Sequence, residues 1–109
     1  MTNTVLDAAH LSEMTAGDIA LQREVAGLFF TQAAAWDEKL AAPEPQTDWK
    51  ILAHTMKGSA KGLGLSKLAE TSARVEAAAA NGVSPAQCAE LRATLHEAVD
   101  ALRAHVAGA

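Results

Sequence analysis

Residues 47–64 read TDWKILAHTMKGSAKGLG, an amphipathic segment that predicts a helix. At about 100° of turn per residue, its apolar side chains gather within roughly a third of the circumference and define a buried side. These residues are Trp49, Leu52, Ala53, Met56, Ala60 and Leu63. Thr47 or Asp48 supplies the N-cap, and the helix is expected to reach about Leu63. The segment therefore predicts one member of a helical bundle, with a second side that faces solvent.

Comparable helices are expected on both sides of this segment. A short first helix is expected over about 6–14, and Asp18 is suited to cap a long second helix that ends near Leu40, before two prolines. A fourth helix is expected over about 67–80, where an Asn-Gly pair ends it. The last helix begins with an N-cap, a proline at its first position and a capping-box partner, which are Ser84, Pro85 and Gln87.

Each of the other long helices carries an apolar stripe at steps of three and four residues, which predicts its buried face. In the second helix the stripe is Leu21, Val25, Leu28, Phe29, Gln32, Trp36 and Leu40, with Gln32 the one polar member. In the fourth it is Leu68, Ser72, Val75 and Ala79, and in the last it is Cys88, Leu91, Leu95, Val99, Leu102 and Val106. We expect these stripes to meet in one core.

The composition favours an all-α domain. Val and Ile together number only eight, Tyr is absent, and Ala supplies 26 of the 109 residues. Such a mixture favours helix over sheet, and the length suits one domain. We expect a single domain over 1–109, an antiparallel up-and-down four-helix bundle with a short additional N-terminal helix lying across one end.

Charge and cysteine usage exclude several classes of protein. The net charge of −4 sets up no general attraction to nucleic acid or to an anionic membrane. One cysteine, Cys88, cannot form an internal disulfide, and the four histidines show no zinc-ligand spacing. The first twenty residues hold no basic residue and no long apolar run, so neither a signal peptide nor a transmembrane span is expected. We expect a cytoplasmic monomer without a metal site.

The solvent-facing side of the helix over 47–64 carries the candidate chemistry. His54 lies about 150° from the centre of the buried side, so its imidazole is expected in solvent. Lys50, Lys57 and Lys61 share its stripe at steps of three and four residues. An alanine in place of Gly58, one turn beyond His54, would stabilise the helix by about 0.5–1 kcal/mol, unless something must come close to the bare backbone there. By itself, a surface helix with lysines and one histidine is the more ordinary interpretation.

The string from His54 to Gly64, HTMKGSAKGLG, fits the pattern HxxKGxxxxxG. It resembles the signature of the histidine-containing phosphotransfer (HPt) domains of two-component phosphorelays. The resemblance covers nearly the whole chain: a leading segment with Asp7 and Leu11, the long second helix, the motif helix and the stretch 68–76. The first and last helices match only in pattern.

The resemblance implies that His54 takes a phosphoryl group on its outer ring nitrogen from an aspartyl phosphate of a receiver domain and passes it to another receiver. The partners would be response-regulator receiver domains and the receiver domain of a hybrid histidine kinase. The Mg²⁺ that the reaction needs would belong to the receiver, so no cofactor is expected on this chain. A neutral imidazole is a competent nucleophile near physiological pH, which agrees with this role.

The neighbours of His54 suit the same reaction. Lys57, together with Lys61 and Lys50, can offset the negative charge that develops on the phosphoryl oxygens. Gly58 leaves room for a receiver's acidic site to approach in line. Lys50, Ile51 and Gly62 flank the site and are the candidates for its docking surface.

Glu76 resembles the polar residue that in many HPt domains comes from the following helix and hydrogen-bonds the inner ring nitrogen of the histidine. The helical rule places Glu76 near the inward face of its own helix, where a carboxylate needs a partner such as His54 or Lys57. A simple salt bridge to a surface lysine is the alternative interpretation.

The remaining candidates are interpreted as structural. His96 and His105 are about 180° apart on the last helix and cannot share a metal, and His10 stands alone. Cys88 is expected to be a small buried hydrophobe, and both tryptophans are assigned to the core. Phe30 lies opposite the main stripe of its helix and is expected to pack under the first helix, with a place in the docking surface as the alternative.

Two other functions stay open from the sequence. The same HxxKG pattern occurs in kinase-substrate domains of the chemotaxis type, which an attached ATPase domain phosphorylates, but no ATP-binding segment is present here. A helical adaptor or antagonist could also bind receiver domains without carrying phosphate. Incorporation of phosphate distinguishes the adaptor from both phosphorylated classes.

Overall fold

Five α-helices and one short 3-10 helix make up the part of the chain that the computed structural model describes, residues 4–108. Residues 1–3 and 109 of the domain predicted over 1–109 lie outside the described residues. No strand occurs between residues 4 and 108. In chain order the elements are α1 (Ala8–Met14), α2 (Ile19–Ala41), α3 (Trp49–Leu63), α4 (Ser66–Ala78), the 3-10 helix η1 (Ala79–Asn81) and α5 (Pro85–Ala107).

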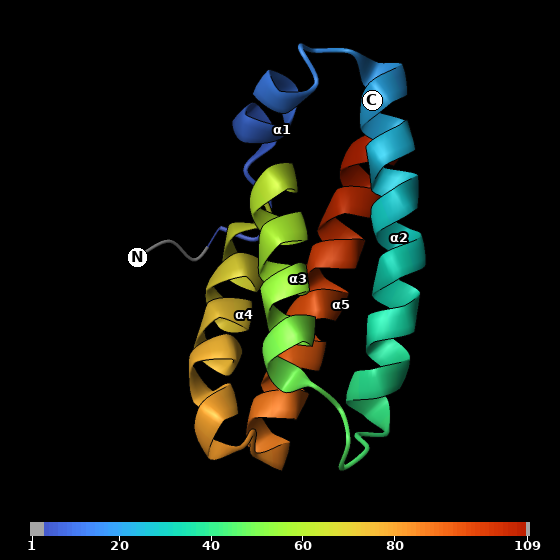
Figure 1. Cartoon of the computed structure of the whole chain (residues 1–109). Coiled ribbons are helices and arrows are strands. Elements are labelled where there is room, and N and C mark those ends of the chain that lie inside the picture. Colours follow the sequence, from blue (N-terminus) through green and yellow to red (C-terminus); the bar gives the residue numbers. More distant parts are fainter. Residues whose placement is uncertain (1–3, 109) are drawn as a thin grey trace.

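The four long helices run alternately up and down as one bundle (Figure 1). α3 packs beside α4, α2 packs beside α5, and α4 also packs on α5. The short α1 lies at the end of the bundle where α3 finishes (Figure 1). The expected all-α bundle with an additional N-terminal helix is confirmed.

Side chains at the helix starts fix the boundaries much as predicted. Asp18 and Asp48 accept hydrogen bonds from backbone N–H groups three residues on, each at 3.1 Å, so the third helix is capped by Asp48. Ser84 and Gln87 form the expected capping box at the start of α5. Asp7 caps α1, which therefore begins at Ala8, and the last turn of the predicted fourth helix is the 3-10 helix η1.

The predicted buried stripe of α2 is wrong over the first half of the helix. Leu21, Leu28 and Gln32 are exposed and Val25 is only half-buried. The buried residues are instead Gln22, Ala26, Phe29, Ala33, Trp36 and Leu40. Small Ala26 and Ala33 let helices approach closely, and the buried Gln22 amide donates to Thr15 Oγ1 at 3.1 Å. The buried face of α2 therefore includes small alanines and one hydrogen-bonded amide, and Leu21 and Leu28 lie on the exposed side of the helix.

The faces of α3, α4 and α5 follow the prediction more closely. Most of each predicted stripe is buried, whereas the residues at its ends, Trp49, Leu63, Ala79 and Val106, are half-buried, as is Val99 within the α5 stripe. Cys88 is buried as expected. Trp49 is therefore only partly a core residue, because it begins α3 at the edge of the bundle.

Phe30 does not pack under α1, so that prediction is wrong. It shares a hollow between α2 and α5 with Val99, and the guanidinium of Arg103 lies 4.8 Å from the centre of its ring. The observed rotation of α2 turns Phe30 towards α5, because Phe29 occupies the core beside it. The Arg103 contact is a cation–π interaction at the surface.

Gly64 ends α3 in the left-handed conformation, with φ of 78°. A Cβ atom there would lie 2.7 Å from the backbone oxygen of Asp7, and the Asp7 N–H donates to the Gly64 carbonyl at 2.7 Å. The N-terminal segment thus lies directly against the end of α3. Both the positive φ and this close approach require glycine at the last position of the HxxKGxxxxxG string.

Candidate functional site

His54 projects from the middle of α3 into solvent, with its side chain 69% exposed. Leu52, Ala53 and Met56 on the same helix are buried and anchor that helix in the bundle. The sequence-based prediction of an exposed imidazole is therefore confirmed. A nucleophile on a rigid, well-packed helix has a fixed direction of approach.

Glu76 of α4 reaches across to α3 and uses each of its carboxylate oxygens for a different partner. Oε2 lies 2.8 Å from Nδ1 of His54, and Oε1 lies 2.6 Å from Nζ of Lys57. Hydrogen bonds from Lys57 first, and then from His54, lower the pKa of the Glu76 carboxyl. The two partners considered for Glu76 from the sequence are both present, and one of them is a lysine of the motif.

This contact defines which nitrogen of His54 is available. An ionised carboxylate only accepts hydrogen bonds, so Nδ1 must carry the proton that it donates to Glu76. In the neutral ring the lone pair is then on Nε2, at the tip of an exposed side chain. The arrangement presents Nε2 to an incoming electrophile and leaves the proton on the opposite side of the ring.

The surroundings of His54 combine bare backbone with cations. Apart from adjoining residues and the nearby backbone of α3 itself, no heavy atom lies within 4 Å of the position that a Cβ would take at Gly58 or at Gly62, so both positions are open. Lys50 and Lys61 are exposed and make no ion pair with any residue of the described range, whereas Lys57 is turned towards Glu76 with its side chain 24% exposed. An approaching anion would meet free ammonium groups along α3.

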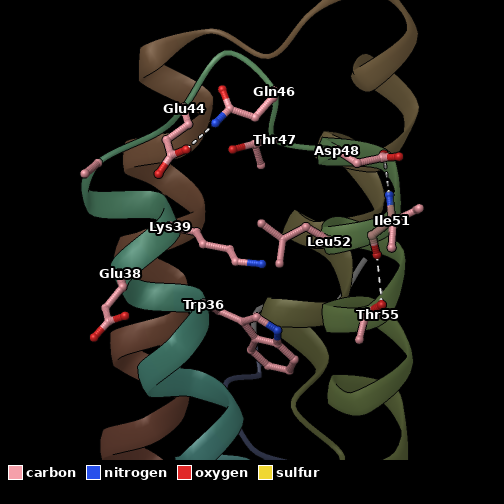
Figure 2. Close-up of a pocket in the computed structure, with 11 residues that line it drawn as sticks. Trp36, Glu38, Lys39, Glu44, Gln46, Thr47, Asp48, Ile51, Leu52 and Thr55 are labelled. Carbon is pink, nitrogen blue, oxygen red and sulfur yellow. Dashed lines mark hydrogen bonds between the residues drawn. The ribbon is translucent and has the colours of Figure 1, made fainter.

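A groove of about 700 Å³ lies between the end of α2 and the start of α3, one turn of helix from His54. Figure 2 shows Trp36 and Lys39 extending from α2 towards Leu52 of α3. Ile51, with 64% of its surface exposed, and Thr55 line the α3 side. Two of its three carboxylates are engaged, because Asp48 caps α3 and Glu44 accepts from Gln46, and the third, Glu38, points away from the groove (Figure 2). The groove therefore provides a concave, partly apolar surface and not an acid–base centre. It is continuous with the face that carries His54 through the exposed side chain of Ile51.

A second histidine is also held by a carboxylate, on the other side of the bundle between α2 and α5. Nε2 of His96 lies 2.6 Å from Oδ1 of Asp37, and Nε of Arg92 lies 2.8 Å from the same oxygen. Arg92 is the main cause of a lowered pKa at Asp37. Here the outer nitrogen, Nε2, is the occupied one. Asp37 and Arg92 were not predicted from the sequence, although Arg92 and His96 are four residues apart and so share a face of their helix.

The other histidines and the cysteine do not form a comparable site. Nε2 of His10 is buried without a hydrogen-bond partner, and His105 is half-buried on α5. Burial raises the pKa of the Cys88 thiol, which disfavours the reactive thiolate. Between residues 4 and 108, no three His, Cys, Asp or Glu side chains are grouped so that they could hold a metal ion. Over the same range no helix is long and apolar enough to span a membrane.

Comparison with known proteins identifies the family. The family model described as Hpt domain matches residues 31–105, a range that begins within α2 and holds α3, α4, His54, Glu76 and most of α5. No curated protein and no solved structure matches the chain. The matched range covers well over half of the sequence and contains the whole HxxKGxxxxxG string. The chain therefore belongs to the Hpt domain family, whose members are phosphocarriers that exchange phosphoryl groups with receiver domains in two-component phosphorelays.

Proposed function

We propose that this protein carries a phosphoryl group on Nε2 of His54, accepts it from the aspartyl phosphate of one receiver domain and passes it to another. The observation that carries the proposal is the geometry of the ring: Glu76 occupies Nδ1, so the exposed Nε2 holds the lone pair. The known role of the family supplies the class of reaction. The protein would act as a stoichiometric carrier and not as a self-contained catalyst.

The transfer needs little from this chain beyond position and charge. The Nε2 lone pair attacks phosphorus in line, the bond from phosphorus to the aspartyl oxygen breaks, and the aspartate leaves as a carboxylate. The proton on Nδ1 stays in place, and the ring becomes a phosphorylated imidazolium next to Glu76. The Mg²⁺ that balances the phosphoryl charge would be the receiver's, and the chain would need no cofactor of its own.

The lysines differ in what they can contribute. Lys61 and Lys50 are free to attract the acidic face of a receiver, whereas Lys57 is bound to Glu76 before the partner arrives. We propose that Lys57 turns from Glu76 to the phosphoryl oxygens as negative charge develops there, since its flexible side chain can reach either group. Gly58 would give the partner close access to the ring.

The docking surface that we propose surrounds His54 on α3. Ile51 supplies exposed apolar area, Gly62 supplies open backbone and Lys50 supplies charge. The groove beside Ile51 extends this surface towards α2. The partners would be response-regulator receivers and the receiver of a hybrid histidine kinase. The protein itself would bind them as a monomer in the cytoplasm.

The test is incubation with a phosphorylated receiver domain and Mg²⁺. We expect one phosphate per chain, held as an acid-labile, base-stable phosphoramidate on His54. The His54→Gln variant should stay folded, because its side chain is in solvent, and should accept none. His96→Gln is the matched control and should accept phosphate normally. Label that persists in His54→Gln would contradict the assignment, and binding of receivers without any incorporation would indicate an adaptor.

A further inference from the structure

The two histidine–carboxylate contacts of this bundle engage opposite ring nitrogens. In the α3–α4 site the carboxylate binds Nδ1 of His54, across the ring from the exposed Nε2. In the α2–α5 site the carboxylate binds Nε2 of His96. Only the first arrangement leaves the carboxylate in place after a group has bonded to the outer nitrogen. Glu76 can therefore act on the phosphorylated form of His54 as well as on the free ring.

Among residues 4–108, Glu76 is the one acidic side chain that hydrogen-bonds to this ring. The other charges of α4 are directed elsewhere: Lys67 and Arg74 pair with carboxylates of α5, and Glu70 lines a hollow with Lys61. The charged and titratable residues of α1, His10 and Glu13, lie at the end of α3 that is marked by Gly64. On α3 itself the neighbouring charges are Lys50, Lys57 and Lys61, all cationic. The 3-10 helix η1, which also packs against α3, carries no charged residue, and the nearest cation of α2, Lys39, lines the groove beyond Ile51 and Thr55. The ammonium groups disfavour positive charge near the ring, whereas the Glu76 carboxylate, 2.8 Å from Nδ1, favours it.

We propose that the Glu76 carboxylate sets the lifetime of the phosphorylated protein by holding the proton on Nδ1 of phosphorylated His54, which keeps the P–N bond easy to break. The inference rests on the proposed function, because it requires phosphorylation at Nε2. It adds a second role for Glu76, in which the charge of its side chain, and not only its position, controls how readily the phosphoryl group departs.

The chemistry of departure explains why this proton matters. When water or an aspartate oxygen attacks phosphorus, the electron pair of the P–N bond goes to Nε2. If Nδ1 carries its proton, the leaving group is a neutral imidazole, which needs no further protonation; if Nδ1 has lost it, the leaving group is a much poorer imidazolate anion. In hydrolysis the attacking water gives its proton to solvent, and the products are inorganic phosphate and neutral His54.

Replacement of Glu76 by glutamine separates charge from position. The glutamine amide oxygen can accept the same hydrogen bond from Nδ1, so the ring keeps its direction, but the negative charge is gone. A group that only orients the ring would leave the phosphorylated form unchanged in this variant. A group that holds the proton by its charge would move the pH dependence of phosphate loss.

The experiment follows phosphate loss without any partner protein. The full chain is phosphorylated with excess phosphoramidate, the reagent is removed, and the phosphohistidine signal is followed by ³¹P NMR from mildly acidic to mildly alkaline pH. In the unaltered protein we expect fast loss to persist to higher pH than in Glu76→Gln. We call the rate of phosphate loss as a function of pH the pH profile. The pH profile of Glu76→Gln should lie about one pH unit lower than that of the unaltered protein, so that loss is roughly tenfold slower on its alkaline side.

Three further variants serve as controls for this result. Asp37→Asn removes the carboxylate of the other histidine pair and should leave the profile unchanged. Lys57→Met removes one of the two partners of Glu76, so that the carboxylate keeps only its contact with His54. The pH profile of phosphate loss should then move to higher pH. Glu76→Ala removes both charge and acceptor, and should move the profile at least as far as Glu76→Gln.

The possible failures are distinct. Superposed profiles for the unaltered protein and Glu76→Gln would overturn this inference while leaving the proposed function intact. Failure of both Glu76 variants to take phosphate at all would also overturn it, because Glu76 would then act on the free ring alone. Absence of phosphohistidine in the unaltered protein would overturn the proposed function itself.

Discussion

The carboxylate of Glu76 shows how far helical geometry alone can go at the scale of single residues. The 100° rule places His54 in solvent and Glu76 near the inward face of α4, and by itself it does not show whether the two side chains meet. In the structure they do, because a glutamate that is 19% exposed can extend along the α3–α4 boundary to a ring at its edge. Side-chain length, which an angular count ignores, decides the contact.

The lysines on the His54 stripe should not be equivalent. Lys57→Ala removes an ammonium group that lies 2.6 Å from Glu76 and within one turn of His54, whereas Lys50→Ala removes only an exposed charge. We expect Lys57→Ala to slow transfer from a phosphorylated receiver by about tenfold or more, and Lys50→Ala to slow it by less than about threefold. Single-turnover transfer rates measure both.

Salt dependence provides the control for that comparison. The effect of Lys50→Ala should shrink as salt is added, because it acts through the general field, while the effect of Lys57→Ala should persist. Both variants should remain folded by circular dichroism. Equal transfer rates in the two variants would show that the stripe acts only as a diffuse charge.

Much of the site could be predicted because its signal is local. His54, Lys57, Gly58 and Gly64 lie within eleven residues of one another in a recognisable string, the first three on one helix and Gly64 at its C-cap. The Asp37–Arg92–His96 cluster could not be found in this way. Asp37 is 55 residues from Arg92, and nothing in the sequence shows which outward-facing side chains of α2 and α5 will meet.

At the scale of the helix, ends were easier to predict than faces. Caps are local: Asp18, Asp48 and the Ser84–Gln87 box bond backbone groups three residues away, so their meaning does not depend on the rest of the fold. The rotation of α2 depends on its neighbours. Leu21 and Leu28 suggested one face, but close packing of α2 required the small side chains of Ala26 and Ala33 there.

Two glycines of the same motif should respond in opposite ways to alanine. At Gly58 a Cβ would meet open space in regular helix, so Gly58→Ala should keep or raise stability, by up to about 1 kcal/mol. At Gly64 the φ of 78° and the 2.7 Å approach to Asp7 both oppose a side chain, so Gly64→Ala should lower stability by about 1–3 kcal/mol. Urea denaturation of the two variants measures the difference.

The transfer rate should depend on Gly58 more than on Gly64, the reverse of the expected order for stability. Gly58→Gln should fold normally, because its side chain points into solvent, yet it should slow transfer far more than Gly58→Ala by obstructing the partner. Gly64→Ala should transfer at a near-normal rate wherever it is folded. Normal transfer by Gly58→Gln would mean that no close approach occurs at this position.

At the scale of the whole molecule, the bundle keeps its two histidine–carboxylate contacts on different helix pairs. α3 and α4 share the contact of the proposed reaction, and α2 and α5 share Asp37 with Arg92 and His96. Phosphorylation or partner docking at the first pair can therefore change the contacts of Glu76 without disturbing those of Asp37. We interpret the α2–α5 cluster as a structural clamp that holds the bundle while the α3–α4 site changes charge.

The clamp should appear in the pH dependence of stability. Arg92 foremost, with His96, lowers the pKa of Asp37 from its ordinary value of 3.8, so the folded protein binds fewer protons than the unfolded chain between the lowered value and 3.8. Its contribution is therefore complete above that window and is lost as the pH falls through the lowered value. We expect Asp37→Asn to lower the melting temperature by a few degrees at neutral pH, and the difference from the unaltered protein to disappear in acid.

Asp100→Asn is the control for this prediction. It removes an exposed carboxylate of α5 that has no ion pair within residues 4–108, and it should not change the melting temperature in this way. If Asp37→Asn lowered the melting temperature by the same amount at every pH, lost packing, and not charge, would explain the clamp.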